Sequence, residues 1–444
     1  MAEKMAANAA VNAATNAASG SATVNDVAPH NASLGFVFAI VLIDMLGFGI
    51  VIPVMPQLIM NLSHMPIGAA ASYAGWLGAG YAVAQFFGAP IVGNLSDRFG
   101  RRPVLLASVG VMGLDYMLQA FAPALWWLVI GRVLAGFTGA SFSAAYAYIA
   151  DVTKPEKRAA GFGLMGMAFG IGFIVGPAAG GLLGTFGPRV PFFAAGVLAL
   201  ANFAFGFVFL KESLGAENRR PFDWRRANAF SALKALRKLD GTVLWLVSAL
   251  GTWQLARIVY PAAWSYFAIA AYGFSVQQVG LTLAAVGIGS TLVQGLLLRI
   301  ALPRLGERKL VMIGVASMIV AALIYTFALS VWEVYLGIVI GSLQGFVQPA
   351  MAGLNSRAVD ARSQGELQGA VQSIGSIAAI FGPPLYTQAL THFSGPGAIA
   401  NLPGMPLLIS AAVSVIALML FLRGAARVAP PVASNGLPPD SAAA

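Results

Sequence analysis

Twelve long apolar segments run through this chain, and they constrain its fold more than any other feature. A helix that crosses the hydrocarbon core of a bilayer needs about 20 mostly apolar residues, and every segment has that length. Because 58% of the 444 residues are hydrophobic and only 9% are charged, a water-soluble domain is excluded. The predicted spans are residues 34–60, 73–95, 103–122, 125–150, 159–184, 190–210, 242–271, 277–299, 310–329, 332–356, 367–390 and 402–422.

The distribution of Lys and Arg predicts the orientation of these spans. With both termini in the cytoplasm, all 26 basic residues fall in cytoplasmic tails and loops except Arg189, Arg132 and Arg257. Basic residues gather on the cytoplasmic side of membrane proteins, and a shift by one span would reverse the bias. The net charge of +10 is thus explained by the lipid bilayer, and nucleic acid is not expected as a partner.

The chain divides into two halves of six spans each. A polar linker, residues 211–241, separates an N-terminal bundle, residues 34–210, from a C-terminal bundle, residues 242–424. The ends, 1–33 and 425–444, are rich in small and polar residues or proline and are predicted to be disordered cytoplasmic tails. The expected fold class is an all-α polytopic membrane protein.

The two halves repeat each other at a constant offset of 206 residues. Glycine matches alone would be weak in a chain with 51 glycines, but a Gly-Pro pair and an Arg-x-Gly-x-Arg triplet also match. Duplicated halves around a central site are typical of secondary transporters. The matches are Arg98-x-Gly100-x-Arg102 with Arg304-x-Gly306-x-Arg308, Gly131 and Gly139 with Gly337 and Gly345, and Gly176-Pro177 with Gly382-Pro383.

Four charged residues fall within predicted spans: Asp44, Asp115, Arg132 and Arg257. Such residues are costly in a membrane and are functional candidates. Asp115 and Arg132 lie at similar depth on either side of the turn between the third and fourth spans, which predicts a salt bridge. A pair that only neutralises itself is the alternative. Asp44 has no partner nearby in sequence, and a carboxyl group whose surroundings alternate can bind and release a proton.

Metal, cofactor and enzyme chemistry find no support in the composition. The chain has no cysteine and three histidines, and all three histidines fall in predicted tails or loops. A membrane-embedded enzyme would need clustered His, Asp or Glu residues near one face, and the sequence contains no such cluster. No cofactor and no metal are therefore expected, and the protein is predicted not to be an enzyme.

Glycine and arginine alternate in the loop between the second and third spans. An ordinary basic loop would also have this composition, but the stretch resembles the signature loop of the major facilitator superfamily. The resemblance implies two six-helix halves that work as a monomeric transporter. The loop residues concerned are Gly93, Asp97, Arg98, Gly100, Arg101 and Arg102.

Small residues mark one stretch of the fifth span. They let helices approach closely, so a packing face is one interpretation. Their spacing also resembles the motif of proton-driven antiporters in the superfamily, and Gly131-Arg132 resembles the arginine motif of the same exporters. The residues of this antiporter motif are Gly163, Gly172, Gly176, Pro177, Gly180 and Gly181.

The first span, with Asp44-Met-Leu-Gly-Phe-Gly-Ile-Val-Ile-Pro53, resembles that of the tetracycline/proton antiporters. The resemblance implies that Asp44, with Asp115 and Arg132, belongs to the proton and substrate site. It also implies antibiotic resistance by drug efflux across a bacterial inner membrane. One departure stands out: those exporters carry an acid in the ninth span, and this chain has none between Lys309 and Glu333.

The superfamily resemblance also implies a latch at the cytoplasmic face. An arginine of the signature loop, here Arg101, and an acid at the end of the fourth span, here Asp151, would hold that face shut when the cavity faces outward. Adding the offset of 206 gives Glu307 and Arg357, with both charges reversed. We therefore expect Glu307 and Arg357 to pair.

A substrate cavity is expected between the halves, lined by polar and aromatic side chains, although each of these could instead form a contact between helices. The function expected is proton-coupled efflux of a small amphipathic compound. A nutrient symporter or facilitator of the same fold is the alternative, and a receptor or scaffold would not need charges within its spans. The cavity candidates are Gln57, Gln254, Arg257, Trp264, Tyr266 and Gln348.

Overall fold

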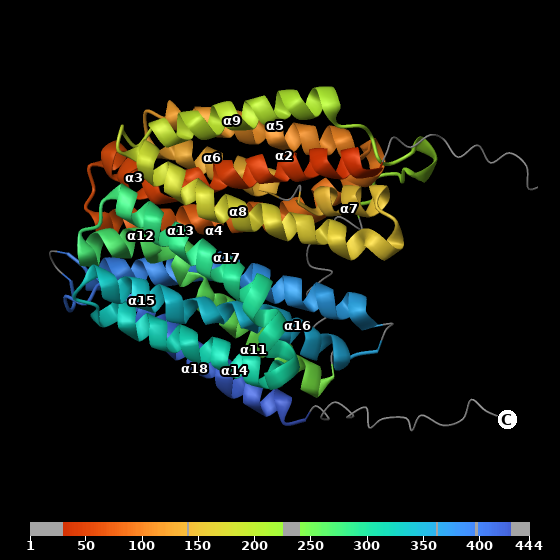
Figure 1. Cartoon of the computed structure of the whole chain (residues 1–444). Coiled ribbons are helices and arrows are strands. Elements are labelled where there is room, and N and C mark those ends of the chain that lie inside the picture. Colours follow the sequence, from red (N-terminus) through yellow and green to blue (C-terminus); the bar gives the residue numbers. More distant parts are fainter. Residues whose placement is uncertain (1–29, 140–141, 225–239, 361–362, 396–397, 428–444) are drawn as a thin grey trace, which may run out of the picture.

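The computed structural model describes residues 30–139, 142–224, 240–360, 363–395 and 398–427, and within these ranges every long regular element is a helix (Figure 1). The predicted tails 1–29 and 428–444 and most of the linker lie outside the described residues. Residues 30–33, predicted as tail, belong to the first helix. The N-half comprises α2 (His30–Val51), η1 (Ile52–Val54), α3 (Met55–Ser63), α4 (Ile67–Phe99), α5 (Arg101–Ala120), α6 (Leu125–Gly139), α7 (Phe142–Val152), η2 (Pro155–Lys157), α8 (Arg158–Gly184) and α9 (Val190–Phe209).

A short turn of helix, η3 (Ala216–Asn218), follows in the linker. The C-half comprises α11 (Gly241–Arg257), α12 (Val259–Tyr272), α13 (Val276–Leu292), the π-helical turn η5 (Val293–Leu297), α14 (Leu298–Phe327), α15 (Val331–Ser342), η6 (Leu343–Phe346), α16 (Val347–Arg357), α17 (Gln364–Phe393) and α18 (Met405–Ala425).

These helices make twelve passes. By length and hydropathy, nine stretches of the described residues qualify as spans, and one of them runs from Val276 to Phe327. Gly306 interrupts that stretch with a non-helical backbone (φ 72°, ψ 163°), so it contains two spans. The long helices α4 and α17 are the remaining two, and the predicted twelve-span fold is confirmed.

Three spans are interrupted midway. The first is broken at η1 and the seventh at Ile258, 206 residues later, so these two breaks correspond across the repeat. The tenth is broken at η6. Proline explains these breaks, because it donates no backbone hydrogen bond: Pro53 lies within the first and Pro56 follows it, Pro261 follows the second and Pro349 the third.

Backbone geometry confirms the repeat in the loops as well. Gly100, between α4 and α5, and Gly306, at the matching position of the C-half, both have positive φ, 105° and 72°. Residues with a side chain rarely adopt this conformation, which glycine adopts at little cost. Glycine is therefore required twice at the same point of the duplicated unit.

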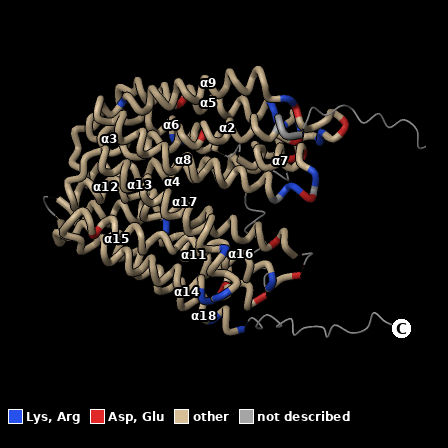
Figure 2. The backbone as a smooth tube through the Cα atoms, in the orientation of Figure 1, with Lys and Arg blue, Asp and Glu red and all other residues tan. Residues whose placement is uncertain are grey.

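The charged loops gather at one end of the molecule, on the right in Figure 2. We call this the charged end; it carries residues 97–102, 151–158 and 299–309. Few charged residues lie at the opposite end. Arg189 is one of them, and its guanidinium donates to the carbonyl oxygens of Ala120 and Ala122, at 3.0 and 2.8 Å, where α5 terminates.

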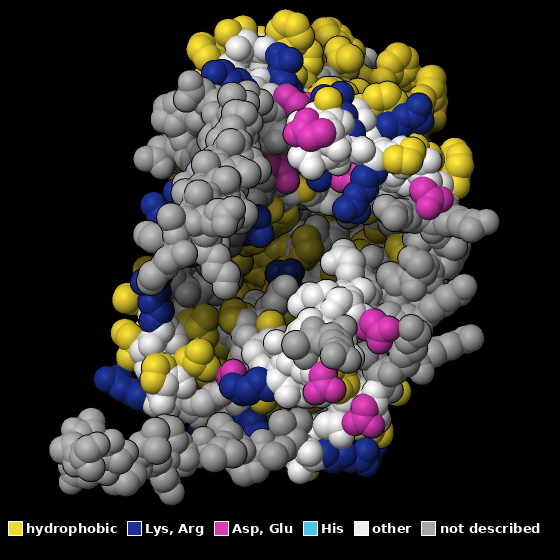
Figure 3. Space-filling model, turned by 90° about the vertical axis from the view of Figure 1, so that its right-hand side faces the viewer, with side chains coloured by type: hydrophobic (Ala, Val, Ile, Leu, Met, Phe, Trp, Pro, Cys, Tyr) yellow, Lys and Arg dark blue, Asp and Glu magenta, His cyan; other side chains and the backbone are white. Residues whose placement is uncertain are grey.

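The two six-helix halves meet along α4 with α17 and α8 with α13. Toward the opposite end Gln388 donates to the Ser72 hydroxyl (2.7 Å) and Thr391 donates to the Gly68 carbonyl (2.6 Å). At the charged end the halves separate, and Figure 3 shows a hollow between them with mainly hydrophobic walls and a basic side chain deep inside. The structure is thus closed at one end and open at the charged end.

Candidate functional site

Asp44 lies on α2 near the middle of the first span and is only 6% exposed. Its Oδ1 atom is buried and has no hydrogen-bond partner among the described residues. One turn further on, Gly47 leaves room for the ring of Tyr116, since a Cβ added there would lie 3.3 Å from that ring. A buried carboxylate without a partner is costly, so Asp44 has the surroundings expected of a group that takes up a proton.

Asp115 and Arg132 are connected through Gln119. The Gln119 amide donates to Asp115 Oδ2 at 2.7 Å, and Arg132 donates to Gln119 Oε1 at 3.2 Å. The predicted direct salt bridge is therefore wrong. Gln119 is one turn beyond Asp115, toward the α5–α6 turn, so its amide reaches the space between the two charges. The carboxylate of Asp115 can lie close to the fourth span because Gly131 has no side chain. A Cβ added at Gly131 would lie 2.6 Å from Asp115 Oδ1.

Tyr116, next to Asp115 on α5, packs its ring against Gly47 of α2, one turn from Asp44. The charges of Asp44, Arg132 and Asp115 all act on its hydroxyl. Tyr81 on α4 interacts electrostatically with Asp44 and Arg132 as well. Four spans of the N-half therefore contribute to one polar cluster. Neither tyrosine is among the predicted site residues, because tyrosine carries no formal charge that would mark it within a span.

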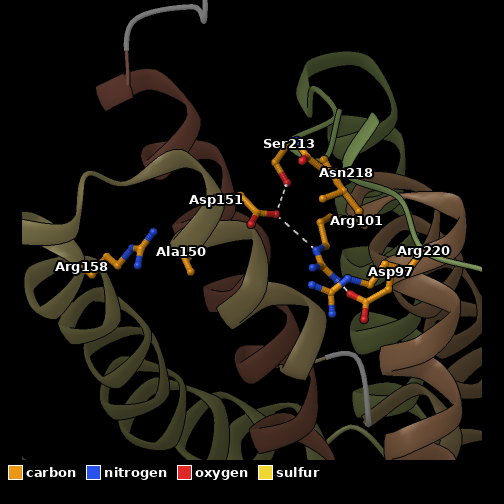
Figure 4. Close-up of a pocket in the computed structure, with 9 residues that line it drawn as sticks. Asp97, Arg101, Ala150, Asp151, Arg158, Ser213, Asn218 and Arg220 are labelled. Carbon is orange, nitrogen blue, oxygen red and sulfur yellow. Dashed lines mark hydrogen bonds and ion pairs between the residues drawn. The ribbon is translucent and has the colours of Figure 1, made fainter. Parts of the chain in front are cut away.

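At the charged end, Arg101 joins the signature loop to the end of the fourth span (Figure 4). Its guanidinium donates to Asp97 at 2.6 Å, to Asp151 at 3.2 Å and to Ser96 at 3.1 Å. The predicted contact between Arg101 and Asp151 is confirmed. Asp97, Arg101 and Asp151 line a cavity of about 510 Å³ whose other walls come from α7, from Arg158 on α8 and from the linker.

The start of the linker is bound to the same loop. The Glu212 carboxylate accepts hydrogen bonds from the backbone N–H groups of Arg101 (2.8 Å) and Arg102, which begin α5. A negative charge at a helix N-terminus is stabilising. A Cβ at Gly100 would lie 2.2 Å from this carboxylate, so glycine is needed there for space and for its positive φ. Ser213 also donates to Asp151, at 3.1 Å.

The other loop candidates have simpler surroundings. Arg102 donates to the Phe207 carbonyl at 2.7 Å and stacks over that residue's ring. Arg98 lies over the ring of Phe99, 5.0 Å from its centroid. A Cβ at Gly93 would lie 3.9 Å from the Ser143 hydroxyl of the fourth span, which is ordinary packing distance.

In the C-half, Glu307 and Arg357 form a salt bridge, as the repeat predicted. Their separation of 50 residues equals that of Arg101 and Asp151. Both pairs join a loop to a helix end within one half, and both are formed although the hollow is open at this end. The expectation that these pairs hold the charged end shut when the cavity faces outward concerns a state other than this one, and it stays a prediction.

The antiporter motif divides between two faces of α8. Gly172, Gly176 and Gly180 face α2 within the same half, and a Cβ at Gly180 would lie 2.0 Å from the Ile50 carbonyl oxygen. Gly181 faces α13 of the other half, and a Cβ added there would lie 3.0 Å from the Val276 carbonyl oxygen. The Pro177 carbonyl oxygen lies close to Gly280 of α13. Gly163 has open space around it.

The predicted cavity residues do not form one group. Gln57 lines a separate cavity of about 380 Å³ toward the opposite end, between α8 and α13. Trp264 is buried and donates to the Thr282 hydroxyl at 3.0 Å, so it forms a contact between helices. Gln254 packs against Gly375 of α17. Trp264 and Gln254 therefore contribute to helix packing, and Gln57 lines a different cavity at the opposite end of the molecule.

Three cavity candidates remain. Tyr266 is buried, its hydroxyl has no partner among the described residues, and the charge of Arg132 acts on it across the halves. Gln348 is exposed on α16. Arg257 is exposed at the end of α11, with its guanidinium 5.6 Å from the centroid of the Trp253 ring.

Comparison with known families fits this geometry. The family model of the Major Facilitator Superfamily matches this chain over residues 37–383 and 254–440. The chain belongs to this superfamily: it is a multi-pass membrane transporter and not an enzyme. The solved structure of the nucleoside transporter NupG has the same fold, with a TM-score of 0.71 and 13% identity over 88% of this chain and 98% of that one.

Within the superfamily the chain is related to tetracycline resistance proteins. It is 37% identical over 395 residues to the class C protein of Escherichia coli, covering 89% of this chain and 98% of that protein. It is 35% identical over 384 residues to the class G protein of Vibrio anguillarum, covering 83% and 95%.

Proposed function

We propose that this protein exports a small amphipathic compound across a bacterial inner membrane in exchange for protons. The charged end and both termini would then lie in the cytoplasm, where basic loops are normally found. The observation that carries the proposal is Asp44, a buried carboxyl group that has no hydrogen-bond partner among the described residues of a bundle related to tetracycline resistance proteins. A compound of the tetracycline kind is one candidate substrate.

The helix contacts support alternating access by rocking of the two halves. Within the N-half, α2 and α8 approach to backbone contact at Gly49 and Gly176, so they move as one body. Between the halves the polar contacts are few and lie toward the opposite end. Breaking them while closing the charged end would turn the hollow to the other side, as in transporters built from duplicated halves.

The polar cluster of the N-half supports proton coupling. Asp44 is protonated where it has no counter-charge, and loses the proton when the rocking movement brings water or a positive charge to it. Asp115 differs from it, since Gln119 and Arg132 already compensate its charge. Asp44 is therefore the better candidate for the exchanged proton.

Transport into everted membrane vesicles tests the proposal. Vesicles containing the protein should accumulate tetracycline, or members of a panel of amphipathic drugs, when an inwardly acidic pH gradient is imposed. A protonophore should abolish that accumulation. Vesicles without the protein provide the background. Substrate movement that follows protons in the same direction would instead identify a symporter, and gradient-independent equilibration would identify a facilitator.

A further inference from the structure

Arg257 is the one charged residue located midway along a span in the described part of the C-half. The remaining charged residues of these spans lie in their end turns, for example Glu333 at the start of α15 and Arg423 at the end of α18. Arg257 stands where proline breaks the seventh span into α11 and α12. Trp253, one turn before it, and Tyr260, one turn after it, lie on the same helix face.

The charge of Arg257 is uncompensated by the residues that the structure describes. No carboxylate of the described residues lies within 4.0 Å of it, and no hydrogen bond from its guanidinium is formed with them. The Arg257 guanidinium lies over the ring of Trp253, 5.6 Å from the ring centroid.

An uncompensated arginine at this depth needs water or an anion. Against lipid its cost would be several kcal/mol, yet Arg257 is exposed, and the water-accessible surface at this depth is the hollow between the halves. The buried Trp253 Nε1–H and Tyr260 hydroxyl on the same face also lack partners among the described residues. The C-half therefore presents an exposed and uncompensated positive charge, with two unsatisfied donors buried beside it.

We propose that Arg257 binds an anionic group of the transported compound, so that amphipathic molecules carrying a carboxylate are preferred over neutral or cationic ones of similar shape. A planar guanidinium pairs with a carboxylate through two parallel hydrogen bonds, and stacking on Trp253 holds its plane in place. The apolar part of the substrate would lie against the hydrophobic walls of the hollow. This inference rests on the proposed transport function and specifies its substrate class: the N-half handles the proton and the C-half the anion.

Three probes with one apolar body test the charge requirement: pyrenebutyrate, its methyl ester and pyrenebutylamine. Binding to the purified protein in lipid nanodiscs is measured by energy transfer from tryptophan to pyrene. The acid should bind at least about tenfold more tightly than the ester or the amine, since a charged hydrogen bond contributes about one to two powers of ten in affinity. Arg257→Gln should remove this advantage and leave the ester unchanged, and Arg257→Lys should retain part of it.

Arg423→Gln is the matched control. Arg423 also stacks on a tryptophan, Trp245 at 5.7 Å, but it lies at the end of α18, so its loss should leave all three affinities unchanged. Equal affinity of the acid and the ester for the unmodified protein, no binding of the acid, or full acid binding by Arg257→Gln would overturn the inference. Because binding needs no proton gradient, failure here is distinguishable from failure of proton-coupled export.

Discussion

Around Asp115, a buried carboxylate is balanced by an arginine that it does not touch. The amide of Gln119 accepts from Arg132 and donates to Asp115, so both charges keep a partner. Such a relay is sensitive to the loss of either charge, because the remaining one stays buried without compensation.

We predict that Asp115→Asn and Arg132→Gln each lower the free energy of unfolding by about 3–5 kcal/mol, as removal of one partner of a buried pair does. The double variant should lose less than the worse single variant, since neither charge is then left alone. Thermal unfolding in detergent measures all three. A double variant whose loss equals the sum of the two single losses would show that the two residues do not interact.

Charged site residues could be predicted from the sequence, whereas uncharged ones could not. Asp44, Asp115, Arg132 and Arg257 were identifiable because charge is rare within spans. Gln119 was not, although its position one turn beyond Asp115 is the spacing at which helix side chains meet. For Trp264 both a cavity wall and a contact between helices were open, because polarity alone does not distinguish the two; its hydrogen bond to Thr282 is of the second kind.

At the scale of helices, α8 has two packing faces, one toward α2 and one toward α13. The face toward α2 stays inside the N-half, while the face toward α13 crosses between the halves. The same substitution should therefore have different effects on the two faces.

We predict that Gly180→Ala lowers the stability of the whole protein by about 1–3 kcal/mol, because its Cβ would overlap the Ile50 carbonyl and force the helices apart. Gly181→Ala should instead disfavour the state open at the charged end, because the contact it crowds belongs to that state. Unfolding temperature measures the first effect, and labelling of cysteines introduced in the hollow measures the second. Gly163→Ala, with open space around it, is the control, and equal effects at all three positions would contradict the two-face description.

The linker start is a second element with a defined contact. We predict that Glu212→Gln weakens its attachment to α5, because a neutral amide complements the helix N-terminus less well than a carboxylate. Hydrogen exchange of the 211–224 backbone should quicken, with little change in unfolding temperature. The matched control is Glu217→Gln, since Glu217 accepts only from its neighbour Asn218. Unchanged exchange in Glu212→Gln would show that this carboxylate does not hold the linker.

Spans were predictable from hydropathy, but their ends and breaks were not. The second span was predicted at 73–95, whereas α4 runs from Ile67 to Phe99. The helix continues beyond the apolar stretch because backbone hydrogen bonds persist where side chains turn polar. The π-helical turn η5 had no signal in the sequence, since no proline or paired glycine marks it.

At the scale of the whole molecule, the duplicated unit has kept its salt bridge and exchanged the charges. Arg101 with Asp151 and Glu307 with Arg357 occupy matching places and join a loop to a helix end in each half. Because both are present with the charged end open, they brace each half as a body and do not tie the halves together.

We predict that Glu307→Arg and Arg357→Asp each reduce transport, and that the double variant recovers most of it. The pair is partly exposed, so its loss should cost about 1 kcal/mol or less, which changes a two-state equilibrium several-fold. Initial transport rates in vesicles, normalised to the amount of protein, measure the effect. A double variant as impaired as the worse single variant would exclude the brace.

The account depends most on Asp44 as the site of the exchanged proton, and proton movement in everted vesicles tests this directly. Adding a transported substrate to vesicles that hold a pH gradient should release protons through the unmodified protein. Asp44→Asn, which keeps the shape of the side chain but cannot titrate, should still be inserted in the membrane and should show no substrate-induced proton release. Proton release by Asp44→Asn equal to that of the unmodified protein would contradict the account.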